Sequence, residues 1–370
     1  MNIKSLLIGS TAALVAVSGA RAADAVVTEP EAVEYVRVCD AYGKGYFYIP
    51  GTETCLKIGG YVRYDIGVGD LFAVTSNTGD ETYFKRARVS FRLSTASETE
   101  LGTLRTYVET RWQFDTNDVA AGYTNDSEFS LNFAYIELGG LRIGKDESYF
   151  TTFTDYAGGV INDDIAGGYG PFDTNLISYS YSNNGFSFGI SLEEGDDSLI
   201  VGGEPRGWGI DDYMPHIVGG VGYDSGVFQI RGVVGYDTRD DVTIGAVTFE
   251  QGGWSAKLRG DVKIGEQASL FAMLMYGENT SAYTTWANGP AGDETFSIIG
   301  GGTFKASEKL SLNAQVQWID GSAASDDVWS VVANAAYEVV PGLTVTPEVA
   351  YLDEGDDDAF GGYLRFQRSF

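Results

Sequence analysis

Several residue types are scarce in this chain of 370 residues. It has two cysteines, four methionines, eight prolines and one histidine, and 24 lysines and arginines against 52 acidic residues. The formal net charge of −28 argues against nucleic acid as a partner, because phosphates require a basic surface. With His216 as the sole histidine, a metal site or a Ser/His triad is poorly supported. After residue 22 no apolar run reaches the roughly 18 residues of a membrane-spanning helix.

The N-terminus has the layout of a secretory signal peptide. A basic start at 1–4 precedes an apolar stretch at 6–17, and the small-x-small site Ala20–Ala22 predicts cleavage after Ala22. The chain therefore divides into a signal peptide at 1–22, a periplasmic N-terminal segment at 23–56 and a third region at 57–370. Export into an oxidising compartment favours one disulfide between the only two cysteines, Cys39 and Cys55, over a metal or redox pair.

From Lys57 onward, stretches of about ten residues alternate apolar with polar side chains and end in turn residues. In 309–318, for example, Leu310 and Val316 share one face and Gln315 lies on the other. The connections alternate between long ones, such as 70–82, 115–127 and 148–174, and short ones, such as 97–100 and 139–140. Short turns at one rim and long loops at the other are typical of transmembrane barrels.

Counting these stretches predicts an all-β fold, a transmembrane antiparallel β-barrel of 16 strands with both ends on the short-turn side. Because short turns and long loops must alternate along the chain, Val242–Glu250 is assigned to a loop, or to an extension of the strand that follows it. Residues 359–370 place Phe360, Leu364, Phe366 and Phe370 on one face. This pattern predicts a last strand in which Phe370 acts as a signal for the outer-membrane assembly machinery.

Several segments resemble one known family over essentially the whole chain. They are MNIKSLLIGSTAALV at the start, EPEAVEYVRVCDAYGKGYFYIPGTETCLKIGGYVRYD at 29–65, VVPGLTVTPEVAY at 339–351 and the ending GGYLRFQRSF. They look like the alphaproteobacterial general porin family. The resemblance implies a sixteen-stranded barrel in the outer membrane, in contact with its lipids, assembled as a homotrimer and carrying an inward-folded third loop.

The polar faces of three neighbouring strands carry a cluster of basic residues. An arginine on the lipid face would cost about 2–4 kcal/mol at mid-bilayer, so these side chains are expected to face the lumen. Loop 148–174, rich in glycine and aromatics, is expected to fold inward and set acidic residues against them. The predicted pore constriction thus comprises Arg63, Arg86, Arg88, Arg92, Arg105, Arg111, Asp155, Asp163 and Asp164. Acidic runs such as Glu193–Asp197 are expected to be solvated in external loops.

The leading functional hypothesis is a water-filled channel for passive diffusion of small hydrophilic solutes and ions, with no cofactor and no enzymatic activity. The alternative is a substrate-specific channel for a sugar or an anion, which predicts a run of aromatic residues in the lumen. The sequence offers only Tyr61 and Tyr107 as isolated candidates. A membrane-embedded lipase would need a Ser/His pair, and a plugged structural barrel would lack a charged constriction.

Overall fold

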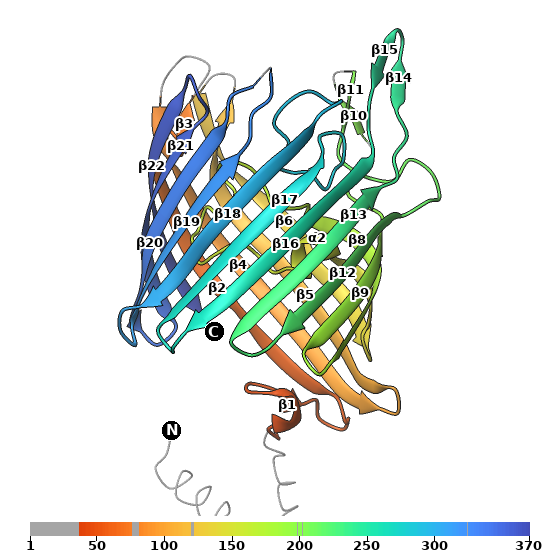
Figure 1. Cartoon of the computed structure of the whole chain (residues 1–370). Coiled ribbons are helices and arrows are strands. Elements are labelled where there is room, and N and C mark those ends of the chain that lie inside the picture. The colour runs from red at the N-terminus through yellow and green to blue at the C-terminus, as the bar shows by residue number, and fades with distance from the viewer. Residues whose placement is uncertain (1–36, 76–80, 120–121, 198, 202, 324) are drawn as a thin grey trace, which may run out of the picture. The chain divides into compact units, whose positions relative to one another are not determined.

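The protein forms an antiparallel sheet that closes on itself. In a computed structural model, residues 37–370 are described except 76–80, 120–121, 198, 202 and 324, so the predicted signal peptide lies outside the described residues. The sheet has 18 strands, two of which, β1 (Phe47–Tyr48) and β3 (Ala73–Thr75), pair only with the ends of others. The barrel wall (Figure 1) consists of the remaining strands, β2 (Cys55–Gly69), β4 (Glu81–Thr99), β5 (Gly102–Val119), β6 (Gly122–Leu138), β7 (Leu141–Glu147), β8 (Asp173–Asn183), β9 (Phe186–Glu193), β12 (His216–Asp224), β13 (Phe228–Asp237), β16 (Gly253–Ile264), β17 (Ala268–Glu278), β18 (Glu294–Lys305), β19 (Leu310–Ile319), β20 (Val328–Val340), β21 (Leu343–Asp353) and β22 (Asp358–Ser369).

The first and last wall strands pair with each other and close the barrel. β2 and β22 run antiparallel in continuous register from Tyr61–Ser369 to Gly69–Gly361. Beyond that register, Phe370 and Gly60 exchange two backbone hydrogen bonds of 3.0 Å. The predicted antiparallel barrel of sixteen strands is therefore confirmed. The role of Phe370 as an assembly signal stays a prediction; its side chain is exposed on the outer surface near the short-turn rim.

The outer face of the wall is apolar, as the alternation predicts. Exposed side chains there include Val62, Phe91, Ile177, Val316 and Val349, while their sequence neighbours turn inward. Aromatic side chains gather at both rims. Near the short turns, the rings of Phe186 and Tyr223 lie 4.8 Å apart. Near the long loops, those of Trp318 and Trp329 lie 6.0 Å apart. Two such girdles around an apolar band are typical of barrels that span a lipid bilayer.

Two loop predictions meet different outcomes. Val242–Glu250 stays outside the wall, where β14 (Val242–Ile244) and β15 (Val247–Phe249) form a separate hairpin that projects beyond the barrel (Figure 1). The predicted long loop 115–127 is wrong, because β5 and β6 extend through it in paired register. Polar residues there alternate within strands that continue past the apolar band, so polarity alone did not mark a loop. Among the described residues, no helix is long and apolar enough to cross a membrane.

The segment before the first wall strand is tied to it covalently. Cys39 and Cys55 form the predicted disulfide, and Cys55 is also the first residue of β2. Between them lie a short 3-10 helix, η2 (Asp40–Tyr42), and β1, which pairs with β2 through two residues only. The ammonium nitrogen of Lys57 lies 5.8 Å from the centroid of the Tyr46 ring. The segment thus contributes little to the pairing that closes the barrel.

We expect Cys39→Ser to leave barrel assembly intact while loosening residues 38–54, because the wall pairing of β2 with β4 and β22 does not involve them. Gel mobility of the unheated protein in detergent should stay that of the folded barrel. Trypsin should cleave the N-terminal segment faster than in the unchanged protein. A variant that fails to fold at all would show that the segment belongs to the folding unit of the barrel.

Candidate functional site

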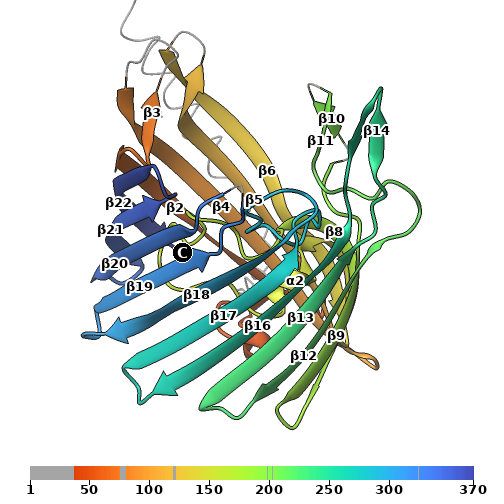
Figure 2. The ribbon, with the colours of Figure 1, turned by 45° about the horizontal axis from the view of Figure 1, so that its top comes forward.

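A long connection between β7 and β8, residues 148–172 and here called the inner segment, lies within the ring of strands (Figure 2). It begins with the helix α2 (Tyr149–Thr152), whose N-cap Ser148 accepts from the backbone N–H of Phe150. Buried Glu193 holds this start. Its carboxylate accepts from Ser148 Oγ and the Tyr149 N–H, both at 2.7 Å, and from the Tyr283 hydroxyl at 3.0 Å. The prediction that Glu193 is solvated is wrong, since it is 1% exposed.

Glycines on the inner face of the wall make room for α2. A Cβ at Gly189 would overlap the hydroxyl of Tyr149, and one at Gly220 would overlap the ring of Phe153. Both glycines have the inward parity of their strands, β9 and β12. The aromatic side chains of the inner segment therefore lie directly against the backbone of the wall. Any larger residue at either position would displace them.

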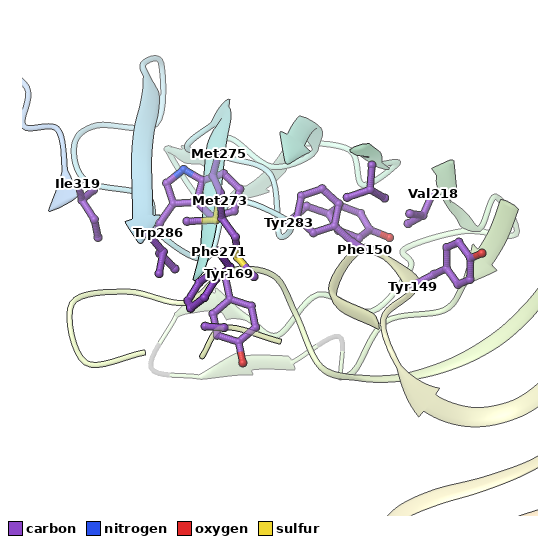
Figure 3. Close-up of a cluster of buried hydrophobic side chains, with 13 residues drawn as sticks. Tyr149, Phe150, Tyr169, Val218, Phe271, Met273, Met275, Tyr283, Trp286 and Ile319 are labelled. Atoms are coloured by element: carbon purple, nitrogen blue, oxygen red, sulfur yellow. The ribbon is translucent and has the colours of Figure 1, made fainter. Parts of the chain in front are cut away.

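An apolar cluster fixes the inner segment against β17 and the loop that follows it (Figure 3). Phe150, Met273, Tyr283 and Trp286 are at most 1% exposed, and the ring of Phe150 lies 5.3 Å from Tyr283. Phe271 and Met275 join them from the inward face of β17. This face is apolar where most inward faces are polar, because protein rather than water covers it. The hydrophobic core of the molecule thus lies inside the barrel, between the inner segment and one arc of the wall.

Polar side chains along the same arc bind the backbone beyond α2. Glu348 of β21 accepts from the N–H groups of Ile161 and Asn162 at 2.5 and 3.0 Å and from the Asn162 side chain at 2.7 Å. Further donors reach carbonyl oxygens of the inner segment from Arg231, Lys257, Arg259, Gln315 and Asn334. These bonds run from β13 to β21. The arc β22, β2, β4, β5 and β6 makes no hydrogen bond with the inner segment among the described residues.

That uncovered arc carries the predicted arginines, and the structure pairs most of them with carboxylates on the same face. Arg63 lies 3.2 Å from Asp65, and Arg86 lies 2.7 Å from Asp115. Glu109 accepts from Arg92 Nε at 2.8 Å and Arg111 Nε at 2.9 Å. It also accepts from the Ser90 and Tyr107 hydroxyls, at 3.0 and 2.9 Å. We call the set Arg63, Arg86, Arg88, Arg92, Arg111 and Arg365 the arginine wall.

Two predicted arginines differ from the rest. Arg88 faces Arg63 across the β2–β4 register, and within the described chain it has no carboxylate partner. Arg105 lies three residues after the start of β5, near the short-turn rim. Six residues separate it from Arg111, which is about 20 Å along a strand. Arg105 therefore lies nearer the short-turn rim than the other arginines, and its part in a constriction stays a prediction.

The three predicted acids of the inner segment take separate positions. Asp155 pairs with Arg231 of β13 at 3.2 Å, away from the arginine wall. Asp163 accepts from the Tyr169 hydroxyl at 3.0 Å, and its carbonyl accepts from Gln315. Burial and the adjacent charge of Asp164 raise the pKa of the Asp163 carboxyl to about 6. Asp164 is exposed and makes no hydrogen bond or ion pair in the described structure.

Sequence reasoning missed several residues of this site. Asp65, Glu109, Asp115 and Arg365 share the inward parity of the arginines they contact, so strand alternation carried the signal. Glu348 could not be assigned in this way, because parity shows that it points inward but not what it binds. The same holds for Lys257, whose ammonium bonds the Tyr169 carbonyl at 2.5 Å and lies 4.8 Å from the Phe150 ring.

A β-bulge adds aromatic side chains to the lumen. The β5–β6 register shifts by one residue at Asn132, so Leu131 points outward while Phe133 and Tyr135 point inward. The Tyr107 ring lies 5.7 Å from Phe133 and 5.5 Å from Tyr135. The prediction that Tyr107 is isolated is therefore wrong. Unbroken alternation from Leu131 would put Phe133 and Tyr135 on the lipid face, but the one inserted residue inverts the parity of the residues that follow it.

A closed barrel with an apolar exterior, two aromatic girdles and a charged interior defines a channel-forming barrel of the outer membrane. The profile of the family described as Porin subfamily matches residues 24–369. The chain is 49% identical over 387 aligned residues to Porin Omp2b of Brucella neotomae, and 48% identical to Porin Omp2b of Brucella canis, each match covering 100% of both chains. The chain therefore belongs to this porin family, which confirms the resemblance seen in the sequence.

Solved structures show the same fold at low sequence identity. The outer membrane channel DcaP of Acinetobacter baumannii is 18% identical with a TM-score of 0.63, covering 87% of this chain and 99% of its own. An anion-selective porin from Comamonas acidovorans is 15% identical with a TM-score of 0.56, covering 86% and 100%. OmpT of Vibrio cholerae, described in a trimer form, is 13% identical with a TM-score of 0.52, covering 86% and 100%. These likenesses establish the architecture alone.

Replacing Glu193 with Ala should release the start of the inner segment. Three buried donors would lose their acceptor, which weakens the anchoring by about 3 kcal/mol or more. We expect larger fluctuations of the open-channel current in planar bilayers and faster proteolysis within 149–170. Glu194→Ala is the matched control, because exposed Glu194 bonds only the Asn175 side chain through its carboxylate. Equal current noise in both variants would contradict the anchoring role.

Proposed function

We propose that this porin forms a water-filled channel in the outer membrane, through which small hydrophilic solutes and ions diffuse passively. The observation that best supports this function is that the inner segment is attached to one side of the barrel. It is hydrogen-bonded to the arc from β13 to β21, and the opposite arc keeps its charged side chains. A solute then crosses between the two. No chemical step is needed for this function, and we propose none.

The constriction we propose lies between the arginine wall and Asp163 and Asp164 of the inner segment. The wall holds six arginines against the three carboxylates of Asp65, Glu109 and Asp115, so its sum is three positive charges. The two aspartates supply the opposite sign. A transverse field of this kind orients dipolar solutes and disfavours apolar ones, which cannot replace the hydrogen bonds of the ordered water.

We further propose that three copies of the chain assemble as a homotrimer. Support comes from family membership and from the trimer form described for OmpT of Vibrio cholerae, which shares the fold. The apolar outer face supplies the surface that neighbouring copies and lipid would cover. The assembly machinery and lipids of the outer membrane are the remaining partners that we expect, with the strand ending in Phe370 as the recognised element.

Removing charge at the constriction should change ion selectivity more than folding. Arg86→Ser with Arg88→Ser should raise conductance modestly and shift the reversal potential in a salt gradient towards cations. Asp163→Asn with Asp164→Asn should shift it the other way. Both shifts should shrink between about 0.1 M and 1 M salt, as the screening length falls from about 10 to about 3 Å. Arg105→Ser, near the short-turn rim, is the control expected to stay close to the original potential. If both double variants keep that potential, the proposed constriction is wrong.

Ion selectivity should also depend on pH through Asp163. Its carboxyl is ionised above about pH 6 and neutral below, so acidification removes a negative charge and should shift the reversal potential towards anions between about pH 7 and pH 5. Asp164, Glu348 and Tyr169 are the titratable groups around it. Reversal potentials of the unchanged protein and of Asp163→Asn test this: the pH step should vanish in the variant, and a step of equal size there would assign the effect to another group.

A further inference from the structure

A polar cavity lies in the lumen on the short-turn side of α2, apart from the proposed constriction. Its volume is about 380 Å³, and its lining comes from β6 to β9, from α2 and from β13. Arg142 of β7 is one of the lining residues and lies opposite Glu137 of β6 and Ser178 of β8 in the strand register. The proposed constriction does not use any of these side chains. The cavity is therefore a separate feature of the channel interior.

Arg142 is held rigidly at the surface of this cavity. Glu137 accepts from its Nε and Nη2 at 3.2 and 2.8 Å, and Asp146 accepts from Nη1 at 2.7 Å. The guanidinium also lies 4.3 Å from the Tyr135 ring. Three of its five N–H groups are thus used, so two remain for a ligand. Because neighbouring carboxylates already fix the plane of the guanidinium, binding a ligand costs little side-chain entropy.

The charged groups around the cavity are paired with one another. Glu137 and Asp146 accept from Arg142, and Arg231 is paired with Asp155 at 3.2 Å, so each guanidinium already has a carboxylate partner. Hydroxyl groups fill the rest of the polar surface. Ser182 of β8 faces Ser187 of β9 in the register, and neither side chain makes a hydrogen bond within the described residues. The cavity thus offers donors and acceptors side by side, with the charges of both guanidinium groups already compensated.

We propose that this cavity is a binding subsite for a neutral polyhydroxylated solute, a sugar of one or two rings. A sugar hydroxyl both donates and accepts, so it can donate to Glu137 or to a serine and accept from the free N–H groups of Arg142 and Arg231. Its apolar ring face matches the rings of Tyr149 and Phe153, which line the cavity with their centroids 5.2 Å apart. A zwitterion would have to displace the existing Arg142 ion pairs. The inference rests on the proposed channel, because the solute reaches the cavity through it.

Current recordings on the full protein in planar bilayers test the subsite. Maltose should produce saturable excess noise in the open-channel current, as single molecules enter and leave the cavity. A polyethylene glycol of matched hydrodynamic size should produce none, because it lacks the vicinal hydroxyls. Diglycine serves as the zwitterionic probe and should also produce none. Saturable noise of equal size with either comparison solute would overturn the assignment to sugars.

Two variants with matched folding controls locate the effect. Glu137→Gln, and separately Ser182→Ala with Ser187→Ala, should raise the maltose concentration for half-maximal noise about tenfold, the loss expected when one hydrogen bond to a charged or preorganised partner is removed. Ser94→Ala changes a lumen-facing serine of β4 outside the cavity and should leave that concentration unchanged. Conductance in maltose-free salt reports on the channel itself. Normal conductance without any maltose noise would overturn the subsite alone, whereas absent conductance would contradict the proposed function.

Discussion

The pairing of every wall strand with two neighbours is the constraint on which the rest of this structure depends. In lipid no water is available to a free N–H or C=O, so a sheet can span the bilayer only if it has no edge. Here β2 and β22 remove the edge, and Gly60 and Phe370 extend the pairing by two further bonds. Closure then fixes which side of each strand meets lipid. Charged and hydrogen-bonding side chains are confined to the interior, where water and the inner segment are their only partners.

Buried carboxylates organise that interior. Among the described residues, no lysine or arginine lies at ion-pair distance from Glu193 or Glu348, yet these carboxylates accept three and four donors respectively, chiefly from the inner segment. Glu109 accepts four donors from the arginine wall and its neighbours. A carboxylate with several donors holds groups from distant parts of the chain in one place, because leaving any of them unbonded would cost about 1–3 kcal/mol. Two of these acids position the inner segment and the third positions the arginines.

Most of the fold could be predicted from the sequence, because alternation and closure are local or geometric properties. The arginine positions followed from the same parity. The exceptions have identifiable physical causes. The inserted Asn132 inverts parity for Phe133 and Tyr135, and nothing in the local composition marks it. Glu193 is the last inward-facing residue of β9, but the acidic residues that follow it led to the prediction that it lies in an external loop. The contacts of Glu348 join residues nearly 190 positions apart, which no local pattern contains.

Among the described residues, the inner segment is hydrogen-bonded to strands from β7 to β21 and not to the arc β22, β2, β4, β5 and β6, and this asymmetry has a consequence for how the channel discriminates. Glu193 binds the start of the segment at Tyr149, and Glu348 binds its middle at Asn162. The apolar cluster around Phe150 and Trp286 holds the part that leads back to β8. Backbone held at three such points cannot widen or narrow the passage without breaking several buried bonds at once. Selection by size is then set by the fold. In the proposed constriction, selection by charge would be set by side chains that project into water from two rigid supports, and these could change in evolution without disturbing the barrel. The residues that hold the shape of the lumen would then differ from those that choose its solutes.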